Sequence, residues 1–273
     1  MIYFVEGIFG AGKTTRARQL CLDQNSHENK SILYYEHEVH NMLDFTRKAC
    51  LSESEFTDFV NELKGILMRK YNKEDTEQLL DKVYNNSVCI DGQRWIAWYK
   101  IGYSDPFADA FVKELHKREV CGGNVGYDTY LSIYMSVWSK YLRASDKRTN
   151  HIYEGALLHN PVIDLVGSYA LPDDEVLLFY DKLQDIIKTV PVRIEYILPD
   201  SVESVLEQAA KERSDSSALW IDSLVRWSET CTYGRLHGLK GFDGAVSLCK
   251  EMIRIHRLIC ENISLPATII ERK

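Results

Sequence analysis

The chain has 273 residues, of which 27% are charged and 45% hydrophobic, the balance of an ordinary soluble protein with enough length for a large core. Its formal net charge of -7 argues against broad nucleic-acid binding, and no apolar run approaches the ~18 residues that a membrane span requires. Seven scattered cysteines without a C-x-x-C pair favour reduced thiols over disulfides or a zinc site, so we expect a cytoplasmic protein.

The chain opens on a short apolar run over residues 2–5 that predicts a buried β-strand, so no signal peptide is expected. Residues 7–14 then match the phosphate-binding spacing G-x-x-x-x-G-K-[ST]. Helix-forming residues follow over 15–22. A glycine-rich loop between a strand and a helix is the context in which this spacing binds phosphate.

Each residue type in this loop has a chemical reason. Gly7, Gly10 and Gly12 let the backbone approach an anion closely, while the loop N–H groups and the start of the helix supply positive charge. We expect Lys13 to contact the β- and γ-phosphates of ATP and the Thr14 hydroxyl to bind Mg²⁺. The predicted ATP-binding residues are Gly7, Ile8, Phe9, Gly10, Ala11, Gly12, Lys13, Thr14 and Thr15.

A second strand is predicted over 31–35, and it ends in an acidic segment that begins at Glu36. Ligands bind at the carboxyl ends of strands in open α/β sheets, so residues 36–40 are the most suggestive acidic cluster in the chain. The alternative is a solvated loop that happens to hold two glutamates and two histidines.

The next stretch predicts two helices and a hairpin. Ser52, with Glu55 three residues later, predicts a helix start, and apolar residues at helical spacing continue the helix. A second helix is predicted over 73–84. Strand-like runs on both sides of Asp91-Gly92 predict a β-hairpin with a tight turn. The alternative is a central strand that ends in a magnesium-linked Asp91.

Two further helices are predicted over 105–118 and 127–142. The second is rich in aromatic residues, which either line a pocket or pack in the core. A third strand over 150–153 then leads to Glu154, and a carboxylate at a strand end is what a P-loop kinase needs near its Mg²⁺. We therefore expect Glu154 to join Thr14 in holding the metal.

The last third of the chain is predicted to contain both helices and strands. Helices are predicted over 160–169, 172–188, 202–212 and 244–263, and strands over 191–198 and 266–270. Lys211, Arg213 and Arg226 are the best candidates for a basic lid, in which Arg213 would clamp the transferring phosphoryl group. The alternative is a solvated helix of mixed charge.

The run Glu6-Gly7-Ile8-Phe9-Gly10-Ala11-Gly12-Lys13-Thr14-Thr15 resembles the opening of the deoxynucleoside kinases, which begin with a strand and an E-G-x-x-x-x-G-K-[ST]-[ST] loop. It is also similar to thymidylate kinases and to small P-loop resistance proteins. The resemblance implies that Glu36 acts as general base, because it stands where those kinases carry a Glu-Pro after the second strand. Glu154 stands at their Glu-Arg or Asp-Arg pair, and residues 211–270 are comparable to their Arg-rich lid, long helix and last strand. His37 and Gly155 depart from the Pro and the Arg of that pattern.

These features predict a single P-loop kinase-like domain over residues 1–273, an α/β fold with a doubly wound, mostly parallel sheet. Its strands are expected near 2–6, 31–36, 150–154, 192–198 and 267–271. A mostly helical insertion with a β-hairpin, over 40–145, is expected to cover the substrate side.

The predicted activity is Mg²⁺-ATP-dependent phosphoryl transfer to a hydroxyl or phosphate of a small molecule, as in nucleoside or nucleotide kinases. Lys13, Glu36 and Arg213 are the predicted catalytic residues. The expected partners are a nucleoside triphosphate and a small-molecule acceptor, without a membrane; a homodimer is left open. Two alternatives are a nucleotide-binding regulator that has no acceptor and a P-loop antibiotic-resistance protein.

Overall fold

The computed structural model describes residues 1–25, 30–90, 92–102, 114–144, 146, 148–213 and 217–272. The chain divides into two compact units, which are described separately. Unit 1 comprises Met1–Tyr35 and Leu131–Lys273, and unit 2 comprises Glu36–Tyr130. The insertion predicted over 40–145 overlaps unit 2, and most of the helix predicted over 105–118 lies outside the described residues.

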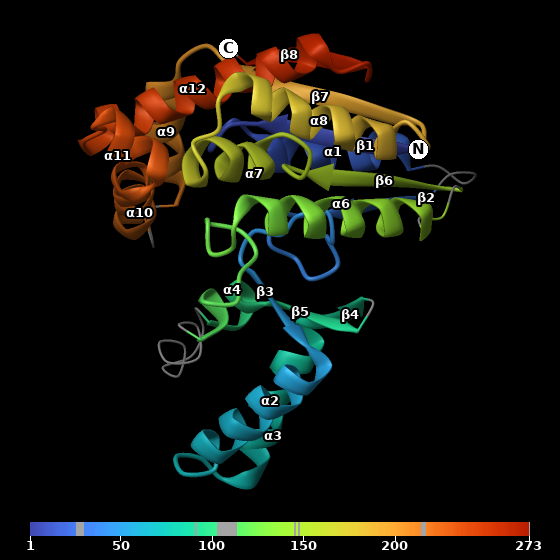
Figure 1. The fold of residues 1–273 in the computed structure, drawn as a ribbon, viewed down its shortest axis with the longest axis vertical. Coiled ribbons are helices and arrows are strands. Elements are labelled where there is room, and N and C mark those ends of the chain that lie inside the picture. Colours follow the sequence, from blue (N-terminus) through green and yellow to red (C-terminus); the bar gives the residue numbers. More distant parts are fainter. Residues whose placement is uncertain are drawn as a thin grey trace. The chain divides into compact units, whose positions relative to one another are not determined.

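Unit 1 is built on a sheet of five strands, all of them parallel to their neighbours. In order across the sheet these are β2 (Lys30–Tyr34), β6 (Thr149–Glu154), β1 (Ile2–Gly7), β7 (Val192–Pro199) and β8 (Ala267–Arg272). The five predicted strands and the α/β class with a parallel sheet are therefore confirmed (Figure 1).

The remaining elements that include residues of unit 1 are helical, and most match the predicted ranges. They are α1 (Lys13–Gln24), α6 (Tyr127–Ala144), α7 (His159–Val162), the π-helix η1 (Ile163–Ser168), α8 (Asp173–Ile187), α9 (Val202–Glu212), α10 (Ser217–Thr230), α11 (Thr232–His237) and α12 (Gly241–Asn262). The predicted helix over 160–169 is thus one α-helical turn that continues as a π-helix, a form often found at functional sites.

Helices cover both faces of this sheet (Figure 1). Successive side chains of a strand point to opposite faces, so neighbouring residues of β1 contact different helices. On one face the Tyr3 hydroxyl donates to Gln24 of α1. On the other face the Phe4 ring stacks on Trp138 of α6, with 5.6 Å between ring centroids, and Trp138 stacks on Tyr134. Trp138 and Tyr134 are fully buried, so the packing interpretation of the aromatic helix is confirmed for these two residues.

The connections of this sheet diverge at its centre. From β1 the chain passes through α1 to the edge strand β2, whereas from β7 it passes through α9 to α12 to the opposite edge strand β8. The neighbouring carboxyl ends of β1 and β7 therefore flank a topological switch point, the place where open α/β sheets bind their ligands. The glycine-rich loop follows β1 directly.

Unit 2 contains a three-stranded antiparallel sheet in the order β3 (Lys48–Ser52), β5 (Gln93–Ala97), β4 (Ser87–Ile90). The predicted hairpin is confirmed by the antiparallel pairing of β4 with β5. The alternative central strand is wrong, since the described residues of β4 belong to this small sheet and not to the parallel one; Asp91 itself lies outside the described residues. The second hairpin strand stops at Ala97, and the next residues form α4 (Trp98–Gly102) instead of continuing it.

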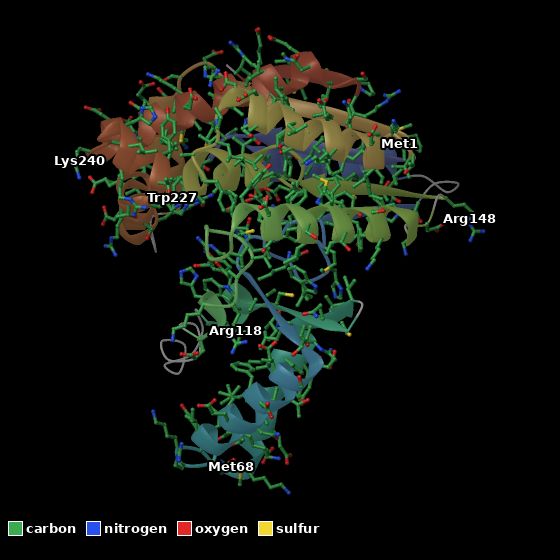
Figure 2. The ribbon with its side chains drawn as sticks, viewed as in Figure 1. Met1, Met68, Arg118, Arg148, Trp227 and Lys240 are labelled. Carbon is green, nitrogen blue, oxygen red and sulfur yellow. The ribbon has the colours of Figure 1, made fainter. Side chains whose placement is uncertain are left out.

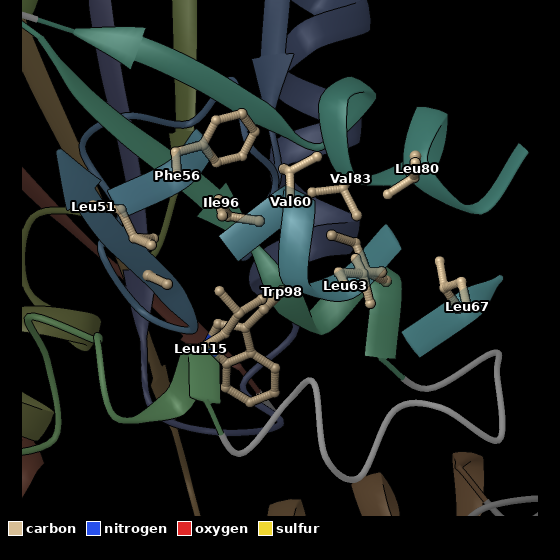
Figure 3. Packing of buried hydrophobic residues seen from close by; sticks show 12 residues of the cluster. Leu51, Phe56, Val60, Leu63, Leu67, Leu80, Val83, Ile96, Trp98 and Leu115 are labelled. Carbon is tan, nitrogen blue, oxygen red and sulfur yellow. The ribbon is translucent and has the colours of Figure 1, made fainter. Parts of the chain in front are cut away.

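Two helices complete unit 2. The α2 helix (Glu53–Leu67) begins with the predicted capping box, and the α3 helix (Lys73–Asn85) follows it. The apolar stripe of α2, with Phe56, Val60 and Leu63, packs with Leu80 and Val83 of α3 and with residues of the small sheet (Figure 3). Unit 2 therefore has its own hydrophobic core, and the apolar stripe of α2 is part of it.

Candidate functional site

The loop between β1 and α1 holds its three glycines in backbone conformations that other residues rarely adopt. Their φ angles are +150° at Gly7, +73° at Gly10 and +92° at Gly12. A Cβ on Gly7 would lie 2.8 Å from the carbonyl oxygen of Ile197 in β7, and a Cβ on Gly10 would lie 2.9 Å from that of Val205 in α9. The loop is therefore compressed against β7 and α9, where only glycine fits.

The α1 helix begins at Lys13, whose side chain folds back over the loop. Its Nζ donates to the carbonyl oxygen of Ile8 at 3.2 Å, and the residue is 5% exposed. A buried ammonium group is costly unless it has polar or anionic partners. The structure thus places the predicted phosphate-binding lysine at the loop backbone, not in bulk solvent.

The predicted metal-binding pair is brought together from opposite parts of the chain. Glu154 ends β6 beside Val5 of β1, and the Thr14 hydroxyl donates to Glu154 Oε1. Glu154 is 4% exposed. Among the described residues there is no group of three or more His, Cys, Asp or Glu side chains that could hold a metal. Two protein ligands suit Mg²⁺, which usually takes its other ligands from phosphate oxygens and water.

Glu6, next to the first loop glycine, is a buried carboxylate that is not among the predicted site residues. Its Oε1 accepts the N–H of Leu157 at 2.8 Å, and its Oε2 accepts the N–H of His159 at 2.9 Å. Burial raises the pKa of Glu6 to about 7, although these backbone donors and the charge of Lys13 act in the opposite direction. Its position directly before Gly7 is the one sequence signal that could have singled it out.

A second unpredicted contact fixes the start of α1. The Arg16 guanidinium donates to both carboxylate oxygens of Glu195 in β7, at 2.7 and 2.9 Å. The bond to Glu195 raises the pKa of Arg16 above its usual value. Paired, planar contacts of this kind are geometrically specific, so this one anchors the helix that carries Lys13 and Thr14 to the central sheet.

Phe9 anchors the middle of the loop to two helices. Its ring meets His159 of α7 edge-on, at 4.6 Å between centroids, and Trp227 of α10 at 6.3 Å. Trp227, labelled in Figure 2, in turn packs against Gly167 of the π-helix. A Cβ on Gly167 would lie only 2.7 Å from Cζ2 of the Trp227 ring. The predicted elements do not include α10, and its contact with Phe9 joins residues more than 200 positions apart, which no local pattern reveals.

The predicted lid residues lie at α9, which packs against Gly10, and on α10, whose Trp227 contacts Phe9. Lys211 and Arg213 are exposed at the end of α9, one helical turn beyond Ala209, which packs against Gly10. Arg226 is exposed on α10. The Arg213 guanidinium lies over the Trp220 ring of α10, 4.1 Å from its centroid, so it already has an aromatic partner.

Glu36, the predicted general base, lies in unit 2 at the start of a partly buried loop. Asp44 is fully buried there and accepts the backbone N–H groups of His37 and Thr46 at 2.7 and 2.8 Å. Burial raises the pKa of Asp44, but the charge of the buried Lys48 and the other partners outweigh it and hold the pKa below its usual range. Glu36 itself is partly buried, and its role as base stays a prediction.

Residues 72–75, Asn-Lys-Glu-Asp, fit the N-K-x-D spacing with which guanine-specific P-loop proteins read their base. In unit 2 they start α3, where Asn72 Oδ1 accepts the Asp75 N–H at 2.9 Å and Asn72 Nδ2 donates to the Asp75 carboxylate. The side chain of Asn72 thus caps the start of α3, and Asp75 is its partner.

The contact of Gly10 with α9 makes a stability prediction. Gly10→Ala should lower the free energy of unfolding by about 1–2 kcal/mol through its left-handed backbone, and by a further ~1–3 kcal/mol through the contact with Val205 and Ala209. Gly238→Ala is the matched control, because Gly238 has φ +64° but open space around its Cβ position. Urea unfolding measures both; equal losses would show that the loop does not press on α9.

No helix of the described ranges is both long and apolar enough to cross a membrane. The described part also contains all seven cysteines as free thiols. Comparison of the chain with models of known protein families, with curated proteins and with solved structures finds no match in any of the three.

Proposed function

We propose that this protein is an ATP- and Mg²⁺-dependent phosphotransferase that acts on a small molecule. The observation that carries the proposal is the hydrogen bond from Thr14, in the glycine-rich loop after β1, to Glu154 at the end of the neighbouring strand β6. A hydroxyl and a carboxylate that meet at the end of a central strand are the two protein ligands that a nucleotide-bound Mg²⁺ requires in P-loop proteins.

The fold supports the same proposal. The first strand is central, the loop opens at the switch point between β1 and β7, and helices cover both faces of the sheet. These features fit a P-loop kinase-like fold of the kind that the deoxynucleoside kinases have, and the free cysteines fit the cytoplasm. Gly7, Gly10 and Gly12 hold the loop in positive-φ conformations that favour glycine, as a backbone that approaches phosphate closely requires.

The residues then take distinct roles in phosphoryl transfer. Lys13 and the loop N–H groups would hold the β- and γ-phosphates, and Thr14 and Glu154 would hold Mg²⁺, directly or through water. When bound, the ion neutralises phosphate charge. Arg213 stabilises charge on the transferring group, and Glu36 accepts the proton of the acceptor hydroxyl. Positioning and charge neutralisation supply most of the rate in such reactions.

The test is nucleotide consumption by the purified protein with Mg²⁺ and either ATP or GTP, with and without a panel of nucleosides, nucleotides and aminoglycosides. ADP formation that depends on a nucleoside or nucleotide supports the proposed kinase. Dependence on an aminoglycoside selects the resistance protein. Slow hydrolysis that no acceptor stimulates selects the nucleotide-dependent regulator, and a lack of any nucleotide binding contradicts all three.

Glu36→Gln should lower kcat by about 10²–10⁴-fold while leaving ATP binding unchanged, because a general base acts on the acceptor and not on the nucleotide. Steady-state kinetics with the acceptor that the panel identifies measures kcat, and calorimetry measures ATP binding. Glu38→Gln is the control, since Glu38 lies in the same segment, also partly buried, and has no assigned role. Full activity of Glu36→Gln would show that another group removes the proton.

A further inference from the structure

Two backbone N–H groups of the turn after β6 are hydrogen-bonded to the Glu6 carboxylate. The backbone pairing of β1 with β6 ends at Val5 and Glu154. The chain then turns at Gly155, whose φ is +67° and whose N–H makes a last backbone hydrogen bond to Val5, 3.0 Å long. At this point the register between β1 and β6 ends, while Glu6 and Gly7 of β1 go on pairing with β7.

Where the backbone pairing of β1 with β6 ends, the Glu6 side chain accepts the next hydrogen bonds from the turn. Its two carboxylate oxygens accept the N–H groups of Leu157 and His159, one each, and all of these groups are buried. A buried backbone donor without an acceptor is costly, so these bonds determine the path of the turn. On the far side of the turn, the Tyr180 hydroxyl of α8 donates to the Leu157 carbonyl oxygen at 2.7 Å.

We propose that Glu6 is a positioning residue of the candidate nucleotide site: its carboxylate fixes the turn over 155–159 and thereby holds Glu154 against Thr14, where Mg²⁺ would bind. The inference rests on the proposed function. Glu154 is held by the β6 pairing on its amino-terminal side and by this turn on its carboxyl-terminal side. The orientation of its carboxylate therefore depends on both, and partners of metal ligands typically govern metal affinity in this way.

Glu6 has to be ionised to accept both N–H groups well, which makes the effect dependent on pH. Burial raises its pKa to about 7. The titratable groups that interact with it come from the loop helix, α8, β7 and α12: Lys13, Tyr180, Tyr196 and Cys260. Since the pKa of Tyr180 and that of Cys260 are both raised, neither carries charge near pH 7, and Glu6 is the group of this set that changes charge there.

The experiment is calorimetric titration of ATP into the full-length protein at a series of Mg²⁺ concentrations. At pH 8, Glu6→Gln should need about tenfold more Mg²⁺ than the wild type for half-maximal ATP affinity, because the amide can accept only one of the two N–H groups. At pH 5.5 the wild-type carboxyl is neutral, so the two proteins should converge. Protonation of ATP itself affects both equally and cancels in the comparison.

Glu119→Gln is the matched control. It makes the same substitution at another buried glutamate, whose carboxylate bonds Trp98 and His116 of unit 2. Its Mg²⁺ requirement should equal that of the wild type. In a Glu154→Gln background, Glu6→Gln should have no further effect on the Mg²⁺ requirement, since Glu6 acts through Glu154.

Three outcomes would overturn the inference. An unchanged Mg²⁺ requirement in Glu6→Gln, or an equal effect at both pH values, shows a role in folding alone, and additive effects in the double variant show that Glu6 does not act through Glu154. If Glu6→Gln does not fold, Glu6→Asp replaces it, because its shorter side chain cannot reach both N–H groups. A wild-type protein that binds no ATP overturns the proposed function as well, which separates the two failures.

Discussion

Lys13→Ala should abolish measurable phosphoryl transfer, with a fall in rate of at least about 10²–10³-fold, while the protein stays folded. The ammonium of Lys13 is buried at the loop backbone, so it is held in place before any nucleotide arrives. Such preorganised charge costs no rearrangement at the moment of reaction, and alanine leaves nothing in its place. Acceptor-dependent ADP formation measures the rate, and thermal unfolding checks the fold.

The control for this variant is Lys182→Ala, which removes the same charge from an exposed position on α8. It should keep the wild-type rate and the wild-type affinity for ATP. If Lys13→Ala bound Mg²⁺-ATP as tightly as the wild type and turned it over at the same rate, the loop over residues 7–14 would not be the nucleotide site. The proposed function would then have no support in the structure.

Local patterns were enough to predict the framework of the fold. The apolar strand before Gly7 and the helix after it follow from periodicity and composition, and the capping box at Ser52 and the turn at Gly92 follow from spacing alone. All five strands of the parallel sheet were predictable for the same reason. Each of these features depends on residues that lie close together in the sequence.

The contacts that build the candidate site join residues that lie far apart in the sequence. Thr14 and Glu154 are 140 residues apart, Glu6 and Leu157 are 151 apart, and Arg16 and Glu195 are 179 apart. No periodicity relates such positions. Glu154 could be predicted because it ends a strand, whereas Glu6 and Glu195 stand within strands whose burial alone decides what their carboxylates contact.

The segment after β2 shows why composition misleads in loops. Two glutamates and two histidines within residues 36–40 suggested either an active site or a solvated loop. The residues that follow are organised around buried Asp44 and Lys48, with the Lys48 ammonium donating to the backbone carbonyls of Asn41 and Asp44, and neither interpretation foresaw this buried pair. Polar residues can be buried when the backbone satisfies them, and a sequence does not reveal which ones are.

Glu154→Gln should raise the Mg²⁺ concentration needed for half-maximal activity by about 10–100-fold, the second large effect that the structure predicts. The amide keeps an oxygen that can accept the Thr14 hydroxyl, so the contact between β6 and the loop survives while the negative charge is lost. Affinity for ATP without Mg²⁺ should therefore stay unchanged or rise slightly, since a carboxylate no longer faces the phosphates.

This separation of effects distinguishes a metal ligand from a structural residue. A glutamate that only held the loop in shape would, when replaced, weaken the binding of ATP with and without the metal to the same extent. Glu175→Gln, an exposed substitution in the first turn of α8, should change neither quantity. If Glu154→Gln kept the wild-type response to Mg²⁺, the ion would have to be held without the β6 carboxylate, and the hydrogen bond to Thr14 would be a packing contact of the sheet.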